Sequence, residues 1–568
     1  MRPSREVTTL RQYSDSPGVS VPDPQTMPQA FQRQVADHPD TVALRSYDGA
    51  QSYTWAEFDA EVRRIAGGLA ALGLRRGDVF ASLLTNRPEF NLAEMAANHL
   101  GATTFSIYNT SAPDQINYLL AHSGARILIT ERQYLATLHE SGADIDHLLV
   151  VEEGDLDRLA PAPDFDFDAA WNAVLPDDVL CMIYTSGTTG PPKGVEHTHS
   201  GVLAMAAAVT SAFPIESGDR VISYLPSAHA ADRCVTYYFG VVYGAQLTTL
   251  NDLSKLPQTL ADVRPTVFSA VPRVWEKLKA GVELQLAGND QLRAGFDADV
   301  PQVIDAIRAK LGLDQVRWAM SGAAACPLGV FNFLRKLRIP VTDIWGMSEI
   351  GLATAAPPEL AKPGTIGTLL PGYEARVLED GELLIRAPFT MKGYRNDPVQ
   401  TAEAKDADGW VHTGDVVTVD DEGYYTIVDR KKELIINAGG KNMSPSNIES
   451  AISTSSMLID KVIAIGDGRP YNVALITLDG AAVPAFAEKF GIEPDPAVLA
   501  KDARVLAVVQ QGVDEGNAKL ARVEQIKKFA VLPTLWNEGG DELTPTGKLR
   551  RKPINAKYAT EIEALYAE

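Results

Sequence analysis

The residues of this chain that could do chemistry begin with a short loop rich in hydroxyl groups, glycines and one lysine. Residues 184–194 read Tyr-Thr-Ser-Gly-Thr-Thr-Gly-Pro-Pro-Lys-Gly, and the apolar run 179–183 before them predicts a buried strand. Glycines let backbone N–H groups approach a phosphate, hydroxyls donate hydrogen bonds to its oxygens, and Lys193 adds a mobile positive charge. The loop therefore predicts a polyphosphate site, although it lacks the Gly-Lys-Ser/Thr ending of a Walker A loop. The alternative is an ordinary Gly/Ser turn between a strand and a helix.

Two later loops each place a carboxylate where a nucleotide could use it. Residues 345–349, Trp-Gly-Met-Ser-Glu, follow an apolar strand, and a carboxylate beside a triphosphate is a natural Mg²⁺ ligand. Glu349 could instead cap the next helix. In residues 412–415, His-Thr-Gly-Asp, the carboxylate of Asp415 could accept both hydroxyls of a ribose, whereas an Asx turn would explain an isolated aspartate.

These segments resemble those of the adenylate-forming superfamily, which includes acyl-CoA synthetases, luciferases and the adenylation domains that make nonribosomal peptides. Matching segments follow the family's order from about residue 180 to 552. Such enzymes join a carboxylic acid to ATP, release pyrophosphate and usually pass the acyl group to a thiol. After the first loop, the strongest match is residues 429–449. Asp232 and Arg233, which follow His229, are similar to an acidic-arginine pair of long-chain acyl-CoA synthetases.

The resemblance implies the residues that bind the nucleotide and coenzyme. Small residues at 321–325 would form the wall beside adenine, and Glu349 and Thr188 would hold Mg²⁺. Ser348 stands where many relatives have threonine, and either residue offers a hydroxyl. The full implied binding set is Thr185, Ser186, Gly187, Thr188, Thr189, Gly190, Lys193, Gly322, Ala323, Ala324, Gly346, Met347, Ser348, Asp415, Arg430, Lys432, Gly439 and Lys441.

The resemblance also implies a catalytic set of Lys548, His229, Glu349 and Thr188. Lys548 lies on a glycine-containing turn at 543–551 and matches the family's catalytic lysine. Its ammonium would stabilise the negative charge that spreads when a carboxylate attacks the α-phosphate and pyrophosphate leaves. His229 would lie beside the acyl carboxylate. Taken alone, a lysine on a turn is usually solvated, and a single histidine is usually structural.

Residues 429–449 would then couple nucleotide binding to domain motion. By resemblance, Arg430 contacts the ribose, Lys432 is the hinge of a mobile lid, and Gly439 faces the thiol in the second half-reaction. A side chain at Gly439 would obstruct the pantetheine tunnel. The alternative is a charged surface hairpin with a Gly-Gly turn. Ser444 and Pro445 predict a helix start, with serine as cap and proline in the first turn.

The elements that must position these residues alternate between helix and strand, which predicts an α/β fold of layered, mainly parallel sheets. A change of pattern near residue 430 predicts a smaller, mobile α+β domain after it. We expect a flexible lead-in at 1–28, an AMP-binding and acyl-binding domain at 29–430 and a lid at 431–568. Helices are expected at 55–74, 88–100, 113–122, 202–213 and 503–522, and strands at 79–84, 103–108, 125–129, 221–225, 266–271, 316–320, 341–345, 462–465 and 473–478.

Composition excludes several classes of function. A chain of 568 residues needs more than one core, and a net charge of −21 argues against nucleic-acid binding. Three scattered cysteines without a CxxC pair predict a reducing compartment. No apolar run reaches the roughly 18 residues of a membrane span, and residues 1–28 lack a signal core, so we expect a cytoplasmic protein.

Contact with a membrane surface stays open at the sequence level. The basic residues 550–552 and 527–528 could meet the phosphates of coenzyme A or an anionic membrane, although a solvated charge run is the simpler interpretation. The oligomeric state is expected to be a monomer or a homodimer.

Together, these features predict an ATP-dependent ligase that activates a medium- or long-chain fatty acid as an acyl-adenylate and transfers it to coenzyme A. The main alternatives are a fatty acyl-AMP ligase that delivers to a carrier protein, and a CoA ligase for a sterol side-chain or aromatic acid. An amino-acid adenylation domain, a luciferase-like oxygenase and a nucleotide-binding regulator without catalysis are weaker alternatives. The regulator is disfavoured because Glu349, Asp415, Arg430 and Lys548 are all present.

Overall fold

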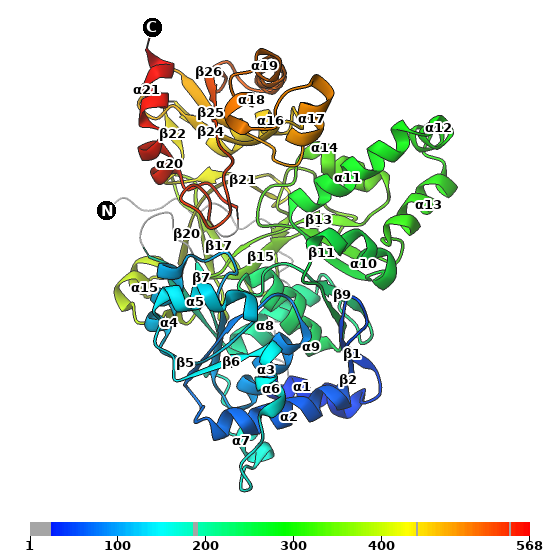
Figure 1. Cartoon of the computed structure of the whole chain (residues 1–568), viewed down its shortest axis with the longest axis vertical. Helices are drawn as coiled ribbons and strands as arrows, with labels where there is room; N and C mark the ends of the chain where they lie inside the picture. The colour runs from blue at the N-terminus through cyan, green and yellow to red at the C-terminus, as the bar shows by residue number, and fades with distance from the viewer. Residues whose placement is uncertain (1–23, 186–190, 439–440, 545–546, 568) are drawn as a thin grey trace.

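The computed structural model describes residues 24–185, 191–438, 441–544 and 547–567. It is a mixed α/β structure in which a large N-terminal domain is capped by a smaller C-terminal domain, drawn in orange and red at the top of Figure 1. The expected fold class is confirmed. Among the residues described, no helix combines the length and the apolar character that crossing a membrane would require.

The first helix begins inside the segment expected to be a flexible lead-in. α1 (Met27–Asp37) starts after Thr26, whose hydroxyl accepts from Gln29 N while the Gln29 side chain accepts from Thr26 N. Met27 is buried, and its N–H donates to His199 Nδ1 at 3.1 Å. The capping box and this long-range bond fix the chain two residues before the expected boundary at residue 28.

The central sheet has seven strands in the order β19-β8-β7-β4-β3-β5-β6. Its helix-separated strands pair in parallel, as expected. β8 and β19 are added antiparallel at one end. The strands are β3 (Val79–Leu83), β4 (Thr103–Ser106), β5 (Ala125–Thr130), β6 (His147–Val150), β7 (Val179–Thr185), β8 (Lys193–Thr198) and β19 (Gly393–Tyr394).

Two further sheets of the large domain also rest on parallel pairs. The order is β2-β1-β10-β9 in one and β11-β12-β13 in the other. Only the β1–β2 ladder is antiparallel. Their strands are β1 (Val42–Ser46), β2 (Ser52–Thr54), β9 (Arg220–Ser223), β10 (Gln246–Thr249), β11 (Val267–Ala270), β12 (Trp318–Ser321) and β13 (Val341–Asp343).

After residue 345 the pairing changes to antiparallel, so the expectation of mainly parallel sheets holds only for the earlier part of the domain. The strands after this point are β14 (Trp345–Met347), β15 (Gly351–Ala355), β16 (Thr368–Leu369), β17 (Glu374–Val377), β18 (Glu382–Arg386), β20 (Val411–Val419) and β21 (Tyr425–Arg430). β14 and β15, β17 and β18, and β20 and β21 are each joined by a short connection, which cannot make the crossover that a parallel pair needs.

Amphipathic helices cover these sheets. In α2 (Trp55–Ala71), Thr54 and Glu57 form a capping box, and Phe58, Val62 and Ile65 recur at helical spacing on the buried face. The other helices of the large domain are α3 (Pro88–His99), α4 (Pro113–Ser123), α5 (Leu135–Ser141), α6 (Asp155–Arg158), α7 (Phe167–Asn172), α8 (His199–Thr210), α9 (Phe239–Tyr243), α10 (Leu256–Val263), α11 (Pro272–Ala287), α12 (Asp290–Asp297), α13 (Pro301–Leu311), α14 (Leu328–Lys336) and α15 (Pro398–Ala404).

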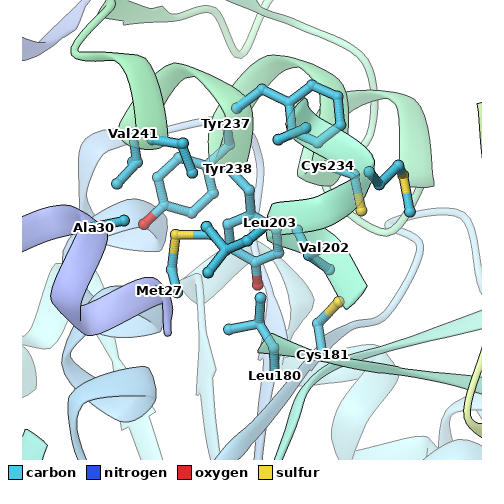
Figure 2. Packing of buried hydrophobic residues seen from close by; sticks show 14 of the residues in the cluster. Met27, Ala30, Leu180, Cys181, Val202, Leu203, Cys234, Tyr237, Tyr238 and Val241 are labelled. Atoms are coloured by element: carbon cyan, nitrogen blue, oxygen red, sulfur yellow. The ribbon is translucent and has the colours of Figure 1, made fainter. Parts of the chain in front are cut away.

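The main core ties the predicted phosphate loop to the segment after His229. Leu180 and Cys181 of β7 pack in the same cluster as Tyr237 and Tyr238, which lie on a π-helix over Ala231–Tyr238 (Figure 2). Such π-helical turns are uncommon and often occur at functional sites. The packing fixes β7 against the element that begins two residues beyond His229.

The C-terminal domain is a three-stranded sheet with helices. Ser444 caps α16 (Pro445–Ser453), as expected. α19 (Ala503–Asn517) ends five residues before the expected 522, because the Asn517 side chain bonds both backbone groups of Ile526 at 2.9 Å. The remaining elements are β22 (Ile435–Ile436), β23 (Asn442–Met443), β24 (Ile459–Ile465), β25 (Asn472–Leu478), β26 (Ile526–Val531), α17 (Val483–Phe490), α18 (Pro496–Leu499), α20 (Arg551–Lys557) and α21 (Ala559–Tyr566).

The two domains meet through ion pairs and a close backbone approach. Arg273 at the start of α11 pairs with Asp479 and, at 3.8 Å, with Asp460 of the C-terminal domain. At Gly539 a Cβ would stand 2.3 Å from the carbonyl oxygen of Thr110, so the loop before Lys548 lies directly on the large domain.

Candidate active site

The predicted phosphate loop joins two antiparallel strands. β7 pairs with β8, and Thr185 lies opposite Lys193 in the register. The loop therefore connects two strands, and not a strand and a helix as the alternative of an ordinary turn supposed. Both ends of the loop are held at defined positions, and the hydroxyl of Tyr118 donates to the Pro192 carbonyl at 3.1 Å. The predicted residues Ser186, Gly187, Thr188, Thr189 and Gly190 lie outside the described residues.

Lys193 and Glu349 meet around one tyrosine. The ammonium of Lys193 lies 4.7 Å from the centre of the Tyr394 ring, and the Tyr394 hydroxyl donates to Glu349 Oε1 at 2.8 Å. Glu349 is only 8 % exposed. Burial, followed by the charge of Glu349, raises the pKa of Tyr394, so the phenol remains a neutral donor. Lys193 and Glu349, which are 156 positions apart in the sequence, thus contact the same tyrosine beside the loop.

Asp415 forms a second anchored carboxylate. It is 3 % exposed, accepts from Trp345 Nε1 at 2.8 Å, and pairs with Arg430 Nε at 2.6 Å. Burial raises the pKa of Asp415, while Arg430 and the Trp345 hydrogen bond act against that rise. The indole and the guanidinium use different oxygens, and each carboxylate oxygen keeps a further lone pair for a ligand hydroxyl.

The small residues expected beside adenine lie at the carboxyl end of β12. A Cβ on Gly322 would stand 2.7 Å from Ile344 Cγ1, so no other residue fits there without a shift. Ala323 and Ala324 are exposed, and Ala323 has a φ of 67°, a strained value for a residue with a side chain. Exposed methyl groups on a fixed backbone leave a flat surface that could accept a ring.

Contacts with Gly351 and His197 fix the segment from Gly346 to Ser348. A Cβ on Gly346 would stand 2.1 Å from the Gly351 carbonyl oxygen. His197 is buried, and its Nε2 lies 2.7 Å from the Ser348 carbonyl oxygen. Burial lowers the pKa of His197 to about 4. The neutral ring therefore donates through Nε2. Met347 is half-buried beside them.

Lys548 from the C-terminal domain reaches the same region. Although Lys548 retains contact with solvent, the protein packed around it removes part of its hydration and lowers its pKa. The charge of Arg430 lowers this pKa further, and the carboxylates of Asp415, Glu433 and Glu349 oppose it. The charge of Lys548 is therefore close enough to act on both anchored carboxylates.

His229 lies within range of the charge of the same lysine. Its Nδ1 accepts from Ala231 N at 3.0 Å, which leaves Nε2 to carry the proton. Burial, with a further contribution from Lys548, lowers the pKa of His229 to about 4. The imidazole is thus neutral near pH 7 and presents a donor near Lys548.

Lys548 is carried on a tight turn. Thr544 N donates to the Lys548 carbonyl at 2.8 Å, and Lys548 N donates to Thr544 Oγ1 at 3.1 Å. Gly547 has a φ of 72°, which favours glycine at this position. These bonds pair Lys548 with Thr544 across the turn, so the lysine lies where the turn ends.

The predicted hinge residue lies between two anchored neighbours. Lys431 pairs with Asp380 at 2.6 Å and Glu382 at 2.8 Å in the large domain, and Glu433 pairs with Arg551 of the C-terminal domain at 3.1 Å. Lys432 is exposed, and no ion pair or side-chain hydrogen bond links it to any other described residue.

Two further predicted residues, Lys441 and Gly439, belong to the segment between β22 and β23. Lys441 is exposed in the turn between β22 and β23, where its N–H donates to Asn437 Oδ1 at 3.0 Å. Gly439 lies outside the described residues. Residues 429–449 do include a small hairpin, as the structural alternative proposed, but Arg430 within them pairs with Asp415 at the site.

Asp232 and Arg233, similar to an acidic-arginine pair of long-chain acyl-CoA synthetases, are bonded inside the protein. Arg233 is fully buried and pairs with Glu94 at 2.5 Å. Asp232 accepts from Ser223 Oγ at 2.8 Å, and burial raises its pKa to about 7. Both side chains support the π-helix that follows His229.

Sequence reasoning missed two residues of the site. Tyr394 was not selected because a Gly-Tyr pair has no chemical signature by itself, and Trp345 was noted only as part of a segment. Each is placed by a contact across more than 40 residues, to Glu349 and Asp415 respectively. The pairing of β19 with β8, which brings Tyr394 to Lys193, could not be read from local periodicity.

The arrangement offers two anchored carboxylates, three cationic side chains and a neutral imidazole around the end of a hydroxyl-rich loop. Oε1 of Glu349 is occupied by Tyr394, and no described residue bonds the other oxygen. The described residues contain no group of three or more His, Cys, Asp or Glu that could hold a metal. A single carboxylate of this kind fits Mg²⁺, which binds through one or two carboxylates, substrate phosphates and water.

Two protein-family models match the chain. The family described as AMP-binding enzyme matches residues 31–395, and the AMP-binding enzyme C-terminal domain matches residues 432–568. A protein named as a fatty-acid–CoA ligase, fadD11, from Mycobacterium tuberculosis is 48 % identical over 73 % of this chain and 78 % of its own length. The long-chain-fatty-acid–CoA ligase FadD15 of Mycobacterium bovis is 32 % identical over 93 % of this chain and 95 % of its own length.

Solved structures share the fold. The O-succinylbenzoate coenzyme A synthetase of Bacillus subtilis, in complex with AMP, aligns with a TM-score of 0.72 at 24 % identity, covering 92 % of this chain and 97 % of that one. A fatty acyl CoA synthetase of Mycobacterium tuberculosis aligns with a TM-score of 0.64 at 24 % identity, covering 94 % and 99 %.

Proposed function

The chain belongs to the AMP-binding enzyme family, and from this premise we propose that it is an ATP-dependent acid–thiol ligase of the fatty-acid–CoA ligase type. It activates a medium- or long-chain fatty acid as an acyl-adenylate and transfers the acyl group to coenzyme A, releasing AMP and pyrophosphate. The relatives at 48 % and 32 % identity carry that name, which supports the choice of fatty acid.

One observation carries the proposal. Lys548 of the C-terminal domain lies where its charge acts on Asp415 and Glu349, the two anchored carboxylates of the large domain. Lys548 and Arg430 bring two positive charges into the same region of the site. The electrostatics of the region therefore favour a phosphate ligand.

In the first half-reaction, the residues of the chain bind and orient the nucleotide. Asp415 accepts the ribose hydroxyls while Trp345 and Arg430 hold its carboxylate, and the loop ending at Lys193 receives the phosphates. Glu349 and Thr188 would hold Mg²⁺, which neutralises phosphate charge. The carboxylate oxygen of the acid attacks the α-phosphorus, the bond to the bridging oxygen breaks, and pyrophosphate leaves.

His229 and Lys548 act where the acid meets the α-phosphate. The neutral imidazole of His229 can donate through Nε2 to the acid without adding a second full positive charge next to Lys548. The Lys548 ammonium then stabilises the charge that spreads over the α-phosphate in the transition state. Neither residue has to move a proton, because the attacking acid is already ionised at pH 7.

In the second half-reaction, the thiol of coenzyme A attacks the acyl carbonyl and AMP leaves. We place the hinge for this step at Lys432, because Lys431 is anchored to the large domain and Glu433 to the smaller one. Rotation would withdraw Lys548 and bring the Gly439 segment and Lys441 toward the thiol. Domain rotations of this kind often limit turnover.

The proposal also includes the cellular setting of the enzyme. The three cysteines are free and buried, which supports a reducing, cytoplasmic setting. We propose that the chain works there as a monomer or a homodimer, with membrane contact at most peripheral.

The decisive experiment is a panel of carboxylic acids of increasing chain length with ATP, Mg²⁺ and coenzyme A. We expect AMP and acyl-CoA in equal amounts, with the highest kcat/KM for medium or long chains. Release of AMP without acyl-CoA, together with loading of a carrier protein, would instead assign the chain as an acyl-AMP ligase. If no acid in the panel releases pyrophosphate, the proposed function is wrong.

A further inference from the structure

We propose that Tyr394 is a positioning residue of the nucleotide site, which keeps the Glu349 carboxylate and the Lys193 ammonium apart and aimed at the same ligand. The inference rests on the proposed function, because it assigns a task to a residue of that site. It follows from the position of the ring between two opposite charges, with a hydrogen bond to one and a cation–π contact to the other.

Tyr394 is itself rigidly placed by backbone bonds. It lies on β19, opposite Val195 of β8, and its N–H donates to Thr401 Oγ1 at 2.9 Å. The next residue, Arg395, donates its N–H to the Gly194 carbonyl at 2.8 Å, directly beside Lys193. The tyrosine therefore moves with the strand that carries the lysine.

The same segment also grips the backbone of the glutamate. Met391 N donates to the Glu349 carbonyl at 2.8 Å, three residues before Tyr394 binds the Glu349 side chain. Residues 391–394 thus hold Glu349 by its main chain and its carboxylate, and hold β8 by a strand pairing. Residues 391–394 therefore connect the phosphate loop to the residues around Glu349, although both lie far from 391–394 in the sequence.

The ring also prevents a direct ion pair. Lys193 forms no ion pair with any described carboxylate, even though Glu349 contacts the hydroxyl of the same tyrosine. Opposite charges in direct contact would tend to neutralise each other, and neither would then be fully available to a phosphate or a cation. With Tyr394 between them, the lysine rests on the ring face and the carboxylate on the hydroxyl.

The test separates the two contacts. Tyr394→Phe removes the hydroxyl but leaves the ring under Lys193, whereas Tyr394→Leu removes both. The matched control is Tyr373→Phe, because the buried Tyr373 hydroxyl donates at 2.8 Å to the Ile350 carbonyl, a neutral partner one residue from Glu349. Each variant is titrated calorimetrically with an ATP analogue that carries a methylene group between the α- and β-phosphorus, with and without Mg²⁺.

We expect Tyr394→Phe to raise the Mg²⁺ concentration for half-maximal analogue binding about tenfold, the value of one hydrogen bond to a charged group, and to change metal-free binding less than about twofold. Tyr394→Leu should weaken metal-free binding as well, since Lys193 is then free to pair with Glu349. Tyr373→Phe should change neither quantity, and all three variants should unfold within a few degrees of one another.

Equal Mg²⁺ dependence in Tyr394→Phe and Tyr373→Phe would overturn the inference, and so would an equal loss of metal-free binding in Tyr394→Phe and Tyr394→Leu. These outcomes are independent of the acid panel. A wild-type chain that binds the analogue but activates no acid would refute the proposed function and leave the role of Tyr394 standing.

Discussion

Replacing Arg273 with alanine should slow the first half-reaction and spare the second. Arg273 connects α11 to Asp479 and Asp460 of the C-terminal domain. Rotation about Lys432 would carry both aspartates away from α11, so these ion pairs stabilise only the arrangement in which Lys548 is in the site.

The size of the effect follows from the exposure of the three side chains. Arg273 is 51 % exposed, while Asp479 and Asp460 are 13 % and 25 % exposed. Solvent screening at such an arginine limits the ion pairs to about 0.5–1 kcal/mol in total. That energy corresponds to a change of about two- to fivefold in the equilibrium between the two domain arrangements.

The assay measures each half-reaction separately. Adenylation is followed by exchange of labelled pyrophosphate into ATP, and thioester formation by a single turnover of preformed acyl-adenylate with coenzyme A. Exchange should fall about two- to fivefold at low salt, and the difference should shrink near 1 M salt, where the Debye length is about 3 Å. Thioester formation should stay unchanged or rise.

The matched control is Arg293→Ala. Arg293 is 50 % exposed and pairs with Asp297 inside α12, so its loss removes a similar ion pair without touching the domain contact. If Arg273→Ala lowers both half-reactions equally, or if Arg293→Ala has the same effect on exchange, the ion pairs of Arg273 do not select between domain arrangements.

Three further outcomes are expected. Lys548→Met should lower pyrophosphate exchange about 10²–10³-fold, the usual cost of losing one transition-state donor, while calorimetry shows nucleotide binding nearly unchanged. Trp345→Phe removes the donor to the buried Asp415 carboxylate and should weaken AMP binding about tenfold by calorimetry, with no loss in Mg²⁺ dependence. Because burial lowers the pKa of His197 from 6.5 to about 4, its contribution to stability is complete above pH 6.5 and is lost as pH falls toward 4; thermal unfolding of His197→Gln should therefore depend less on pH in that window than the wild type does.

Much of the secondary structure could be predicted because local patterns were strong. The expected strand at 179–183 forms β7, and the Ser444-Pro445 pair starts α16. The errors have long-range causes. The helix expected to reach 522 stops at Asn517, whose side chain binds Ile526, and the lead-in ends early because Met27 bonds His199.

The residues of the site also fall into two groups, those that the sequence predicted and those that only long-range contacts revealed. Lys193, Glu349 and Asp415 were selected from the sequence because the residue types of their loops suit a nucleotide, whereas Lys548 was selected through the family order of the motifs. Their partners were not selected. Trp345 contacts Asp415 only because β14 meets β20, and the pKa of His229 is lowered first by burial and then by Lys548 of the C-terminal domain.

By itself, the sequence determined which chemical groups this protein has and which kind of ligand they suit, since hydroxyls, glycines and charges act at spacings set by the chain. Only the tertiary structure decided which groups share a carboxylate, which stay apart and which domain supplies the lysine. Those contacts join segments up to hundreds of residues apart, such as Glu196 with Arg395 and Arg273 with Asp479. They depend on strand register and domain docking, which are set by burial across the whole core and not by any local pattern.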